Sequence, residues 1–179
     1  FDSINHRGPD SSNIFESDKF LLGHKRLSII DINSRSDQPF SDGENFLLYN
    51  GEIYNYQKLK EKLVKKYRCT FITEGDTEVL FHGLKNEGID FLQKIDGMFS
   101  FCFVTSKGET ILARDQYGQK PLFYGFDKCN NLVLGSELSS LVKLLQKKSL
   151  SKNEHAFIKY FQFGASIAPL TFYNELSQV

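Results

Sequence analysis

Five residues in the first half of the chain could together bind a small charged molecule and stabilise an oxyanion: Arg26, Asn50, Gly51, Glu52 and Asp76. A guanidinium is the preferred group for holding a carboxylate through two parallel hydrogen bonds. The side-chain amide of Asn50 and the backbone N–H of Gly51 can both point at one oxygen, as an oxyanion hole requires. The carboxylates of Glu52 and Asp76 could meet an ammonium. The set describes an α-amino acid whose side chain undergoes acyl transfer.

Each of these residues also has a plain structural explanation. Asn-Gly commonly closes a strand because both residues tolerate positive φ at little cost. Arg26 could simply pair with a surface acid. Asp76 stands where a helical pattern begins and could serve as its N-cap. No single member of the set proves the chemistry.

The composition limits the classes of function. The chain has 179 residues, 40% of them hydrophobic, enough for one good-sized core. Lys plus Arg and Asp plus Glu both number 22, so no overall field favours nucleic acid. Apolar runs fall far short of the roughly 20 residues that cross a bilayer, so we expect a soluble protein without a membrane partner. Three cysteines without CxxC spacing favour a reducing cytoplasm over a disulfide framework.

The order of short apolar runs and turns favours antiparallel sheet covered by helices. The run "FSFCFV" is apolar at nearly every position, so both faces of that strand should be covered. The pattern predicts hairpins over 12–24, 98–115 and 121–137 and helices over 56–67, 77–88 and 139–148, with one more helix after residue 150. Asn55 is expected to cap the helix over 56–67.

Eight ordered blocks resemble one known family. They are "HRGPD", "HKRLSIID", "QPF", "YNGEIYNY", "GDTEVL", "DGMFSFCFV", "ARDQYGQKPLFYG" and "GSELSSL". In this order and spacing they are similar to the class II glutamine amidotransferase domain of glutamine-hydrolysing asparagine synthetases, which belongs to the N-terminal nucleophile hydrolases. The resemblance implies an α+β fold, a four-layer αββα sandwich of two antiparallel sheets. It also implies an amidotransferase domain over 1–150, with 151–179 as its C-terminal end leading towards an absent ATP-dependent synthetase domain.

The resemblance assigns a role to each candidate residue. Arg26 and the backbone of Leu27, Ser28, Ile29 and Ile30 would hold the glutamine α-carboxylate. Glu52 and Asp76 would receive the α-ammonium, and Asn50 and Gly51 would form the oxyanion hole. The family usually has a serine at the position of Gly75. We expect this difference to affect the fine geometry of the loop and not the role of Asp76.

The nucleophile is the main departure from the family. Family members use an N-terminal cysteine whose own α-amine is the general base, whereas this chain begins with Phe1. Cys69, Cys102 and Cys129 carry no such amine, and Cys102 in its apolar strand is typical of a core residue. We therefore expect a chain truncated before the catalytic cysteine, unable to turn over glutamine by itself.

The resemblance also sets expectations about cofactors and partners. This chain needs no cofactor or metal, and ATP and magnesium are expected only in the absent synthetase domain. The four histidines, His6, His24, His82 and His155, have no metal-ligand spacing. The small-molecule partner is glutamine, and the sequence leaves open whether a homo-oligomer forms. Two alternatives remain, an amidotransferase for another acceptor such as an envelope sugar or peptide intermediate, and a non-catalytic scaffold of the same fold.

Overall fold

A computed structural model describes residues 2–27, 34–146 and 150–179. Within this range the chain divides into two compact units, residues 1–119 and 120–179. All the candidate site residues belong to the first unit. The functional boundary expected at residue 150 stays a prediction.

The centre of the first unit is an antiparallel sheet in the order β3-β4-β5-β6. Its strands are β3 (Phe40–Ser41), β4 (Phe46–Ile53), β5 (Gly97–Val104) and β6 (Thr110–Arg114). The register pairs Asn50 with Ser100 and Ile53 with Gly97 along β4 and β5. The "YNGEI" stretch is therefore paired with β5 along its whole length.

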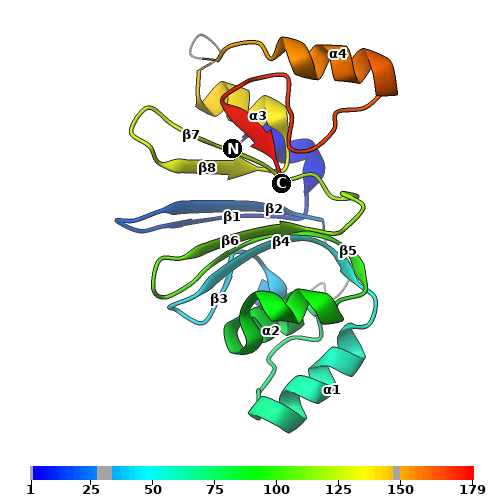
Figure 1. Cartoon of the computed structure of the whole chain (residues 1–179). Coiled ribbons are helices and arrows are strands. Elements are labelled where there is room, and N and C mark those ends of the chain that lie inside the picture. The colour runs from blue at the N-terminus through cyan, green and yellow to red at the C-terminus, as the bar shows by residue number, and fades with distance from the viewer. Residues whose placement is uncertain (1, 28–33, 147–149) are drawn as a thin grey trace. The chain divides into compact units, whose positions relative to one another are not determined.

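Two helices cover one side of this sheet, α1 (Tyr56–Tyr67) and α2 (Asp76–Glu87), as Figure 1 shows. Apolar residues of α1 at i, i+4 spacing, Leu59 and Leu63, are each 2% exposed. Val79 and Leu80 of α2 are fully buried against them and the sheet. The short helix η3 (Gly88–Lys94) follows α2 after Gly88, whose φ of 61° ends that helix.

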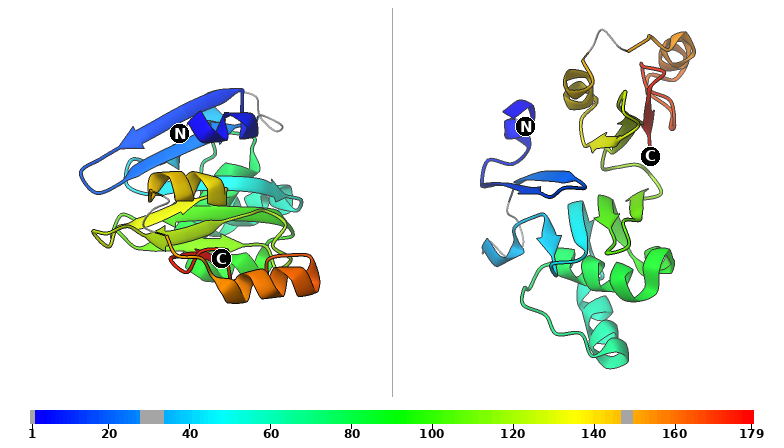
Figure 2. Two further views of the ribbon diagram at one scale, coloured as in Figure 1. Left: turned by 90° about the horizontal axis from the view of Figure 1, so that it is seen from above. Right: turned by 90° about the vertical axis from the view of Figure 1, so that its left-hand side faces the viewer.

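A long hairpin lies on the other side of the same sheet (Figures 1 and 2). It pairs β1 (Ser11–Glu16) with β2 (Leu21–Arg26), after a short helix η1 (Asp2–Arg7). The ring of Phe15 lies 4.4 Å from that of Phe46, and the ring of Phe20 lies 5.2 Å from it. Every residue from Phe99 to Val104 is buried, as a strand covered on both faces must be.

The second unit is a smaller sheet in the order β8-β7-β9 with two helices. Its elements are β7 (Phe123–Phe126), β8 (Leu132–Gly135), α3 (Leu138–Leu144), α4 (Glu154–Phe163) and β9 (Leu176–Gln178). Leu141 of α3 is 2% exposed and faces Gly135 of β8. Asn153 caps α4 through its side chain, which accepts from Ala156 N.

The three predicted hairpins and the predicted helices are present. Of the helix expected over 139–148, α3 ends at Leu144 and Gln146 has a φ of 60°, while residues 147 and 148 lie outside the described range. Asn55 takes the N-cap position of α1 without a side-chain cap; its amide bonds Lys94 O and Asp96 N instead. Among the described residues, no helix is both long and apolar enough to cross a bilayer.

Candidate glutamine-binding site

Asn50, Gly51 and Glu52 lie inside β4 rather than in a turn. Neither Asn50 nor Gly51 has positive φ, so the turn explanation of Asn-Gly does not apply. Gly51 is required for another reason. A Cβ at this position would lie 2.2 Å from the carbonyl oxygen of Met98 on β5, which no side chain can satisfy without moving the strand.

The backbone of β4 places the N–H of Gly51 at an open edge of the sheet. In an antiparallel strand, alternate residues direct their N–H groups to opposite neighbours. Tyr54 N donates towards the β5 side, to Asp96 O at 2.8 Å. Tyr49 N and Ile53 N donate the other way, to Gln38 Oε1 at 2.6 Å and to Asp76 Oδ2 at 2.9 Å.

Gly51 lies midway between those two residues, so its N–H points to the same edge. Within the described range, β3 pairs with β4 only at Phe46 and Leu47. Beyond these two residues, the backbone of β4 is bonded on this side by the side chains of Gln38 and Asp76. An oxygen arriving between the Gln38 amide and the Asp76 carboxylate would find the Gly51 N–H, which is the geometry that an oxyanion donor needs.

Asp76 is the first residue of α2, and the N-cap position belongs to Gly75. The loop before it is fixed by Glu78, which is 2% exposed. Its carboxylate accepts from the backbone N–H groups of Ile72 and Thr73 and from the Thr73 hydroxyl, at 2.7 to 3.1 Å. These bonds fix the position of the first turn of α2 and hence the point at which Asp76 contacts β4.

The Asp76 carboxylate is held in place from two directions. The Tyr49 hydroxyl donates to Oδ2 at 2.7 Å and Ile53 N donates to the same oxygen. Burial raises the pKa of Asp76 above its usual value, while these donors and the first N–H groups of α2 oppose the rise. A nearby ammonium would bring this pKa down again, because an opposite charge favours the ionised form.

Arg26 ends β2 and is 8% exposed. Its Nη1 lies 3.0 Å from Oδ1 of Asp37, which also accepts from the Ser11 hydroxyl. Burial tends to raise the pKa of Asp37, but the bonds from Arg26 and Ser11 outweigh it and lower the pKa. The sequence alone did not decide whether Arg26 pairs with an acid, and the structure shows that it pairs with Asp37. A guanidinium has five N–H donors, so the pair alone does not exclude a second carboxylate.

One short segment connects the candidate groups. Asp37 pairs with Arg26, and the next residue, Gln38, bonds both the N–H and the C=O of Tyr49, at 2.6 and 2.9 Å. The imidazole Nε2 of His24, on β2, lies 3.2 Å from the same Tyr49 carbonyl. Residues 36–38 therefore fix β2, with Arg26, against the strand that carries Gly51.

The structure connects three of the residues expected from the sequence. Arg26, Gly51 and Asp76 are connected through Tyr49 and the segment 36–38. Glu52 alternates with Ile53, so its side chain leaves the opposite face of β4 from Tyr49. Leu27 is 57% exposed. Ser28, Ile29 and Ile30 lie outside the described residues.

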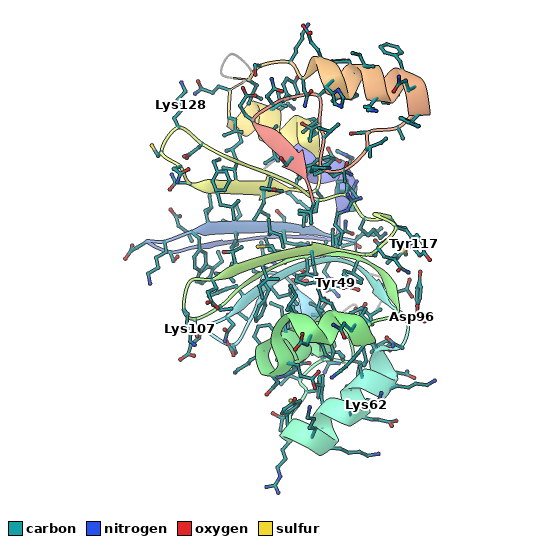
Figure 3. All side chains as sticks on the ribbon, viewed as in Figure 1. Tyr49, Lys62, Asp96, Lys107, Tyr117 and Lys128 are labelled. Atoms are coloured by element: carbon teal, nitrogen blue, oxygen red, sulfur yellow. The ribbon has the colours of Figure 1, made fainter. Side chains whose placement is uncertain are left out.

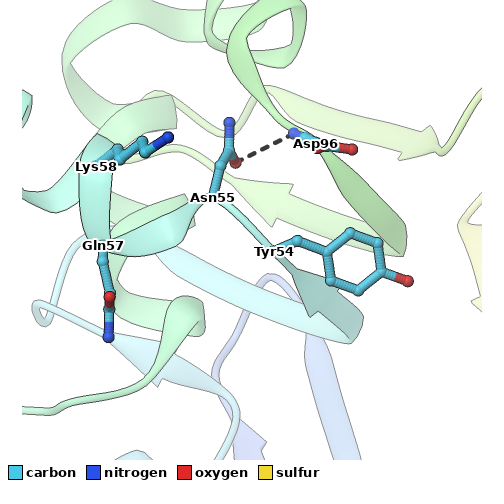
Figure 4. Close-up of a pocket in the computed structure, with 5 residues that line it drawn as sticks. All are labelled: Tyr54, Asn55, Gln57, Lys58 and Asp96. Carbon is cyan, nitrogen blue, oxygen red and sulfur yellow. Dashed lines mark hydrogen bonds between the residues drawn. The ribbon is translucent and has the colours of Figure 1, made fainter.

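A polar hollow of about 260 Å³ lies where β4 leads into α1. It is lined by Tyr54, Asn55, Gln57, Lys58 and Asp96, shown in Figure 4, and not by the residues expected from the sequence. The Asn55 side chain there joins Lys94 O and Asp96 N. These bonds tie the end of β4 to the start of β5 and so hold the register of Asn50 and Gly51.

Sequence reasoning missed the groups that position the site. Tyr49 shares the face of β4 that carries Leu47 and Ile53 and has the pattern of a core residue. Gln38 could have been suspected, because a polar residue directly before Pro39 in a buried turn needs partners. No sequence pattern would have identified Asp37 as a residue that positions the site.

The three cysteines lack the properties of an activated thiol. Cys102 is buried in β5, and burial raises the pKa of its thiol to about 12. Burial also raises the pKa of Cys69. Cys129 lies exposed in the turn between β7 and β8. A nucleophilic thiol has a lowered pKa, so neither Cys69 nor Cys102 is prepared for attack.

Asp115 and its neighbour Arg114 have a structural role. The Asp115 carboxylate accepts from the backbone N–H groups of Phe99, Tyr117 and Gln119. The Arg114 guanidinium donates to Gly118 O. Both therefore fix the loop after β6. No group of three or more His, Cys, Asp or Glu side chains suited to a metal occurs in the described part of the chain.

The family described as "Glutamine amidotransferase domain" matches residues 1–179. The chain belongs to this family of glutamine amidotransferase domains. Among curated relatives, asparagine synthetase B (glutamine-hydrolysing) of Escherichia coli K12 is 37% identical over 78% of this chain and 25% of its own length. The putative asparagine synthetase 2 (glutamine-hydrolysing) of Methanocaldococcus jannaschii is 34% identical over 96% of this chain and 37% of its own length.

A solved structure shares the fold. Glutamine phosphoribosylpyrophosphate amidotransferase from Bacillus subtilis, complexed with ADP and GMP, superposes with a TM-score of 0.57 and is 27% identical over 70% of this chain and 29% of that one. The α+β class of the N-terminal nucleophile hydrolases, expected from the resemblance, is confirmed. This chain spans between 25% and 37% of the length of these relatives.

Proposed function

We propose that this domain binds free glutamine and supplies its amide nitrogen, as ammonia, for the ATP-dependent amidation of aspartate by an asparagine synthetase. The observation that carries the proposal is the arrangement along β4: Gly51 N–H lies between Gln38 and Asp76, with Arg26 held nearby through Asp37. This arrangement supplies a donor for an oxyanion, an acceptor for an ammonium and a fork for a carboxylate.

The dimensions of the edge suit one amino acid. Residues two apart on a strand are separated by about 6.6 Å, since each contributes about 3.3 Å. Gly51 and Ile53 have this separation, and Ile53 N marks the position of the Asp76 carboxylate. A side-chain carbonyl at Gly51 would then leave the α-ammonium of the same molecule within reach of Asp76. Asparagine and longer homologues would fit this spacing less well.

The chemistry follows from these positions. A thiolate attacks the side-chain amide carbon, and the carbonyl oxygen becomes an oxyanion that Asn50 and Gly51 stabilise. Ammonia leaves after gaining a proton, and water hydrolyses the thioester to release glutamate. The family uses an N-terminal cysteine for this attack, and we assign the role to none of Cys69, Cys102 and Cys129.

The same proposal covers the partners and cofactors. Ammonia would pass to a synthetase domain, where ATP and magnesium would be used, and this chain would hold neither. A homo-oligomer and a cytoplasmic location stay predictions from the sequence. The acceptor could instead be another carboxylate, but the relatives described above favour aspartate.

The test is glutamate release from glutamine by the full-length natural protein. Asn50→Ala should lower kcat by about 10²–10³, the effect of losing one oxyanion donor, without changing the fold. Asn86→Ala is the matched control, because Asn86 is an exposed residue of α2. Unchanged turnover in Asn50→Ala would overturn the oxyanion assignment.

A further inference from the structure

Asp76 is a buried residue, with only 5% of its surface exposed. A buried carboxylate needs donors to stay ionised. Oδ2 receives two, the Tyr49 hydroxyl at 2.7 Å and Ile53 N at 2.9 Å. The backbone N–H groups of Asp76 and Thr77 also bond this carboxylate, so the side chain of Asp76 is held in one position at the start of α2.

Tyr49, which is labelled in Figure 3, lies on β4 and is itself rigidly held. The residue is 4% exposed. Its backbone is bonded at both N–H and C=O by Gln38, and His24 also reaches the C=O. The hydroxyl therefore stays at a fixed point beside α2. Burial and the charge of Asp76 raise the pKa of Tyr49 well above its ordinary value, so the phenol remains a donor.

We propose that Tyr49 is a positioning residue for the α-ammonium of the substrate: its hydroxyl, together with Ile53 N, holds the Asp76 carboxylate in the orientation in which it receives the cation. This inference rests on the proposed function and deepens it. The carboxylate would otherwise have more than one rotamer at the helix start. Tyr49 does not touch the reacting amide, so its effect falls on binding and not on the chemical step.

The variant that tests this role is Tyr49→Phe, which keeps the ring and removes only the hydroxyl. In the full-length natural protein we expect KM for glutamine to rise about 5- to 20-fold, the effect of weakening one charge-assisted contact. The value of kcat should stay within about twofold, because the lost contact is made in ground and transition states alike. Tyr67→Phe is the matched control: Tyr67 also donates to a carboxylate, that of Glu87 at 3.0 Å, but at the C-terminal ends of α1 and α2.

A second substrate separates positioning from general support of the fold. Glutaramate is glutamine without its α-amine, so it makes no ammonium contact. Tyr49→Phe should leave its kcat/KM unchanged. An equal loss for glutamine and glutaramate would show that Tyr49 merely supports the site and would overturn the proposal.

A pH profile and a double variant give independent measures. Removing the hydroxyl takes away a donor to the ionised carboxylate, so the pKa of Asp76 rises further. As the pH is lowered, KM of Tyr49→Phe should therefore begin to increase at a higher pH than KM of the wild type.

On an Asp76→Asn background, Tyr49→Phe should have no further effect on KM; additive effects would contradict the proposal. If the folded wild-type protein neither binds nor hydrolyses glutamine, the proposed function fails first, and this inference with it.

Discussion

The Ser36 hydroxyl and Gly75 face each other across a small space at the start of α2. A Cβ built on Gly75 would lie 3.9 Å from Ser36 Oγ, which is ordinary contact distance. Ser36 is 5% exposed, and its hydroxyl has no hydrogen-bond partner among the residues that the structure describes. Gly75 has φ of −86° and ψ of 159°, so a side chain can be placed there without strain.

Gly75→Ser should therefore stabilise the domain. The new hydroxyl would occupy the N-cap of α2 and lie within reach of Ser36, and the unfolded chain would lose some freedom, together about 0.5–1 kcal/mol in the free energy of unfolding. Thermal or urea unfolding measures it. Gly51→Ser is the contrasting variant, since its Cβ would meet Met98 O at 2.2 Å. A destabilised Gly75→Ser would show that the loop cannot accept the side chain.

Glu78→Ala should destabilise the domain by about 2–3 kcal/mol, because it leaves buried donors of Ile72 and Thr73 without an acceptor. Glutamine binding should weaken as well, since the same loop places Asp76. Glu74→Ala is the control: its side chain is 78% exposed and pairs with Lys60 at the surface, where such pairs contribute little. Equal unfolding free energies for the two variants would contradict this role of Glu78.

His24 should make stability depend on pH. Burial, and to a lesser degree the charge of Arg26, lower the pKa of His24 to about 4 from 6.5. A lowered folded-state pKa gives stability that is present above the unfolded value and is lost as pH falls. Between pH 7 and pH 5 this loss amounts to at most about 2 kcal/mol. Unfolding of the wild type and His24→Gln across that range should show a flatter profile for the variant; parallel profiles would exclude His24 as the cause.

Arg26→Lys should raise KM for glutamine with little change in kcat, even though the charge is kept. A lysine cannot present a planar fork to a carboxylate. It can still pair with Asp37, so the fold should persist. Steady-state kinetics of the full-length natural protein check this, and an unchanged KM would remove Arg26 from the carboxylate site.

The cysteine assignment is tested by replacing all three thiols. Full-length protein with Cys69→Ser, Cys102→Ala and Cys129→Ser should still release glutamate from glutamine, because Cys69 and Cys102 have raised thiol pKa values and Cys129 lies in an exposed hairpin turn. Loss of activity that is restored by reverting a single cysteine would identify that residue as the nucleophile.

Local patterns were enough to predict the hairpins and helices. Leu59 and Leu63 follow the helical period, and the turn over 106–108 contains Gly108 with a φ of 83°. The candidate residues were predicted from their types, since each has a residue type that its chemistry demands. What the sequence could not supply is contact between distant residues. Tyr49 bonds Asp76 across 27 positions and Gln38 across 11, and neither spacing has a local signature.

Asn55 shows the opposite limit. Its type and position before a helix predict a cap, yet its side chain bonds Lys94 and Asp96, about forty residues away. Tertiary contacts overrode the local preference, because those bonds join the end of β4 to the start of β5.

The central claim is that Arg26, Gly51 and Asp76 hold a single free glutamine by its carboxylate, its side-chain carbonyl and its ammonium. Calorimetric titration of the full-length natural protein with L-glutamine, L-glutamine methyl ester and glutaramate tests it most directly. We expect L-glutamine to bind best and each analogue, lacking one charged group, to bind at least about tenfold more weakly, the effect of one lost charge-assisted contact. Equal affinity for all three, or no binding of L-glutamine by folded protein, would contradict the account.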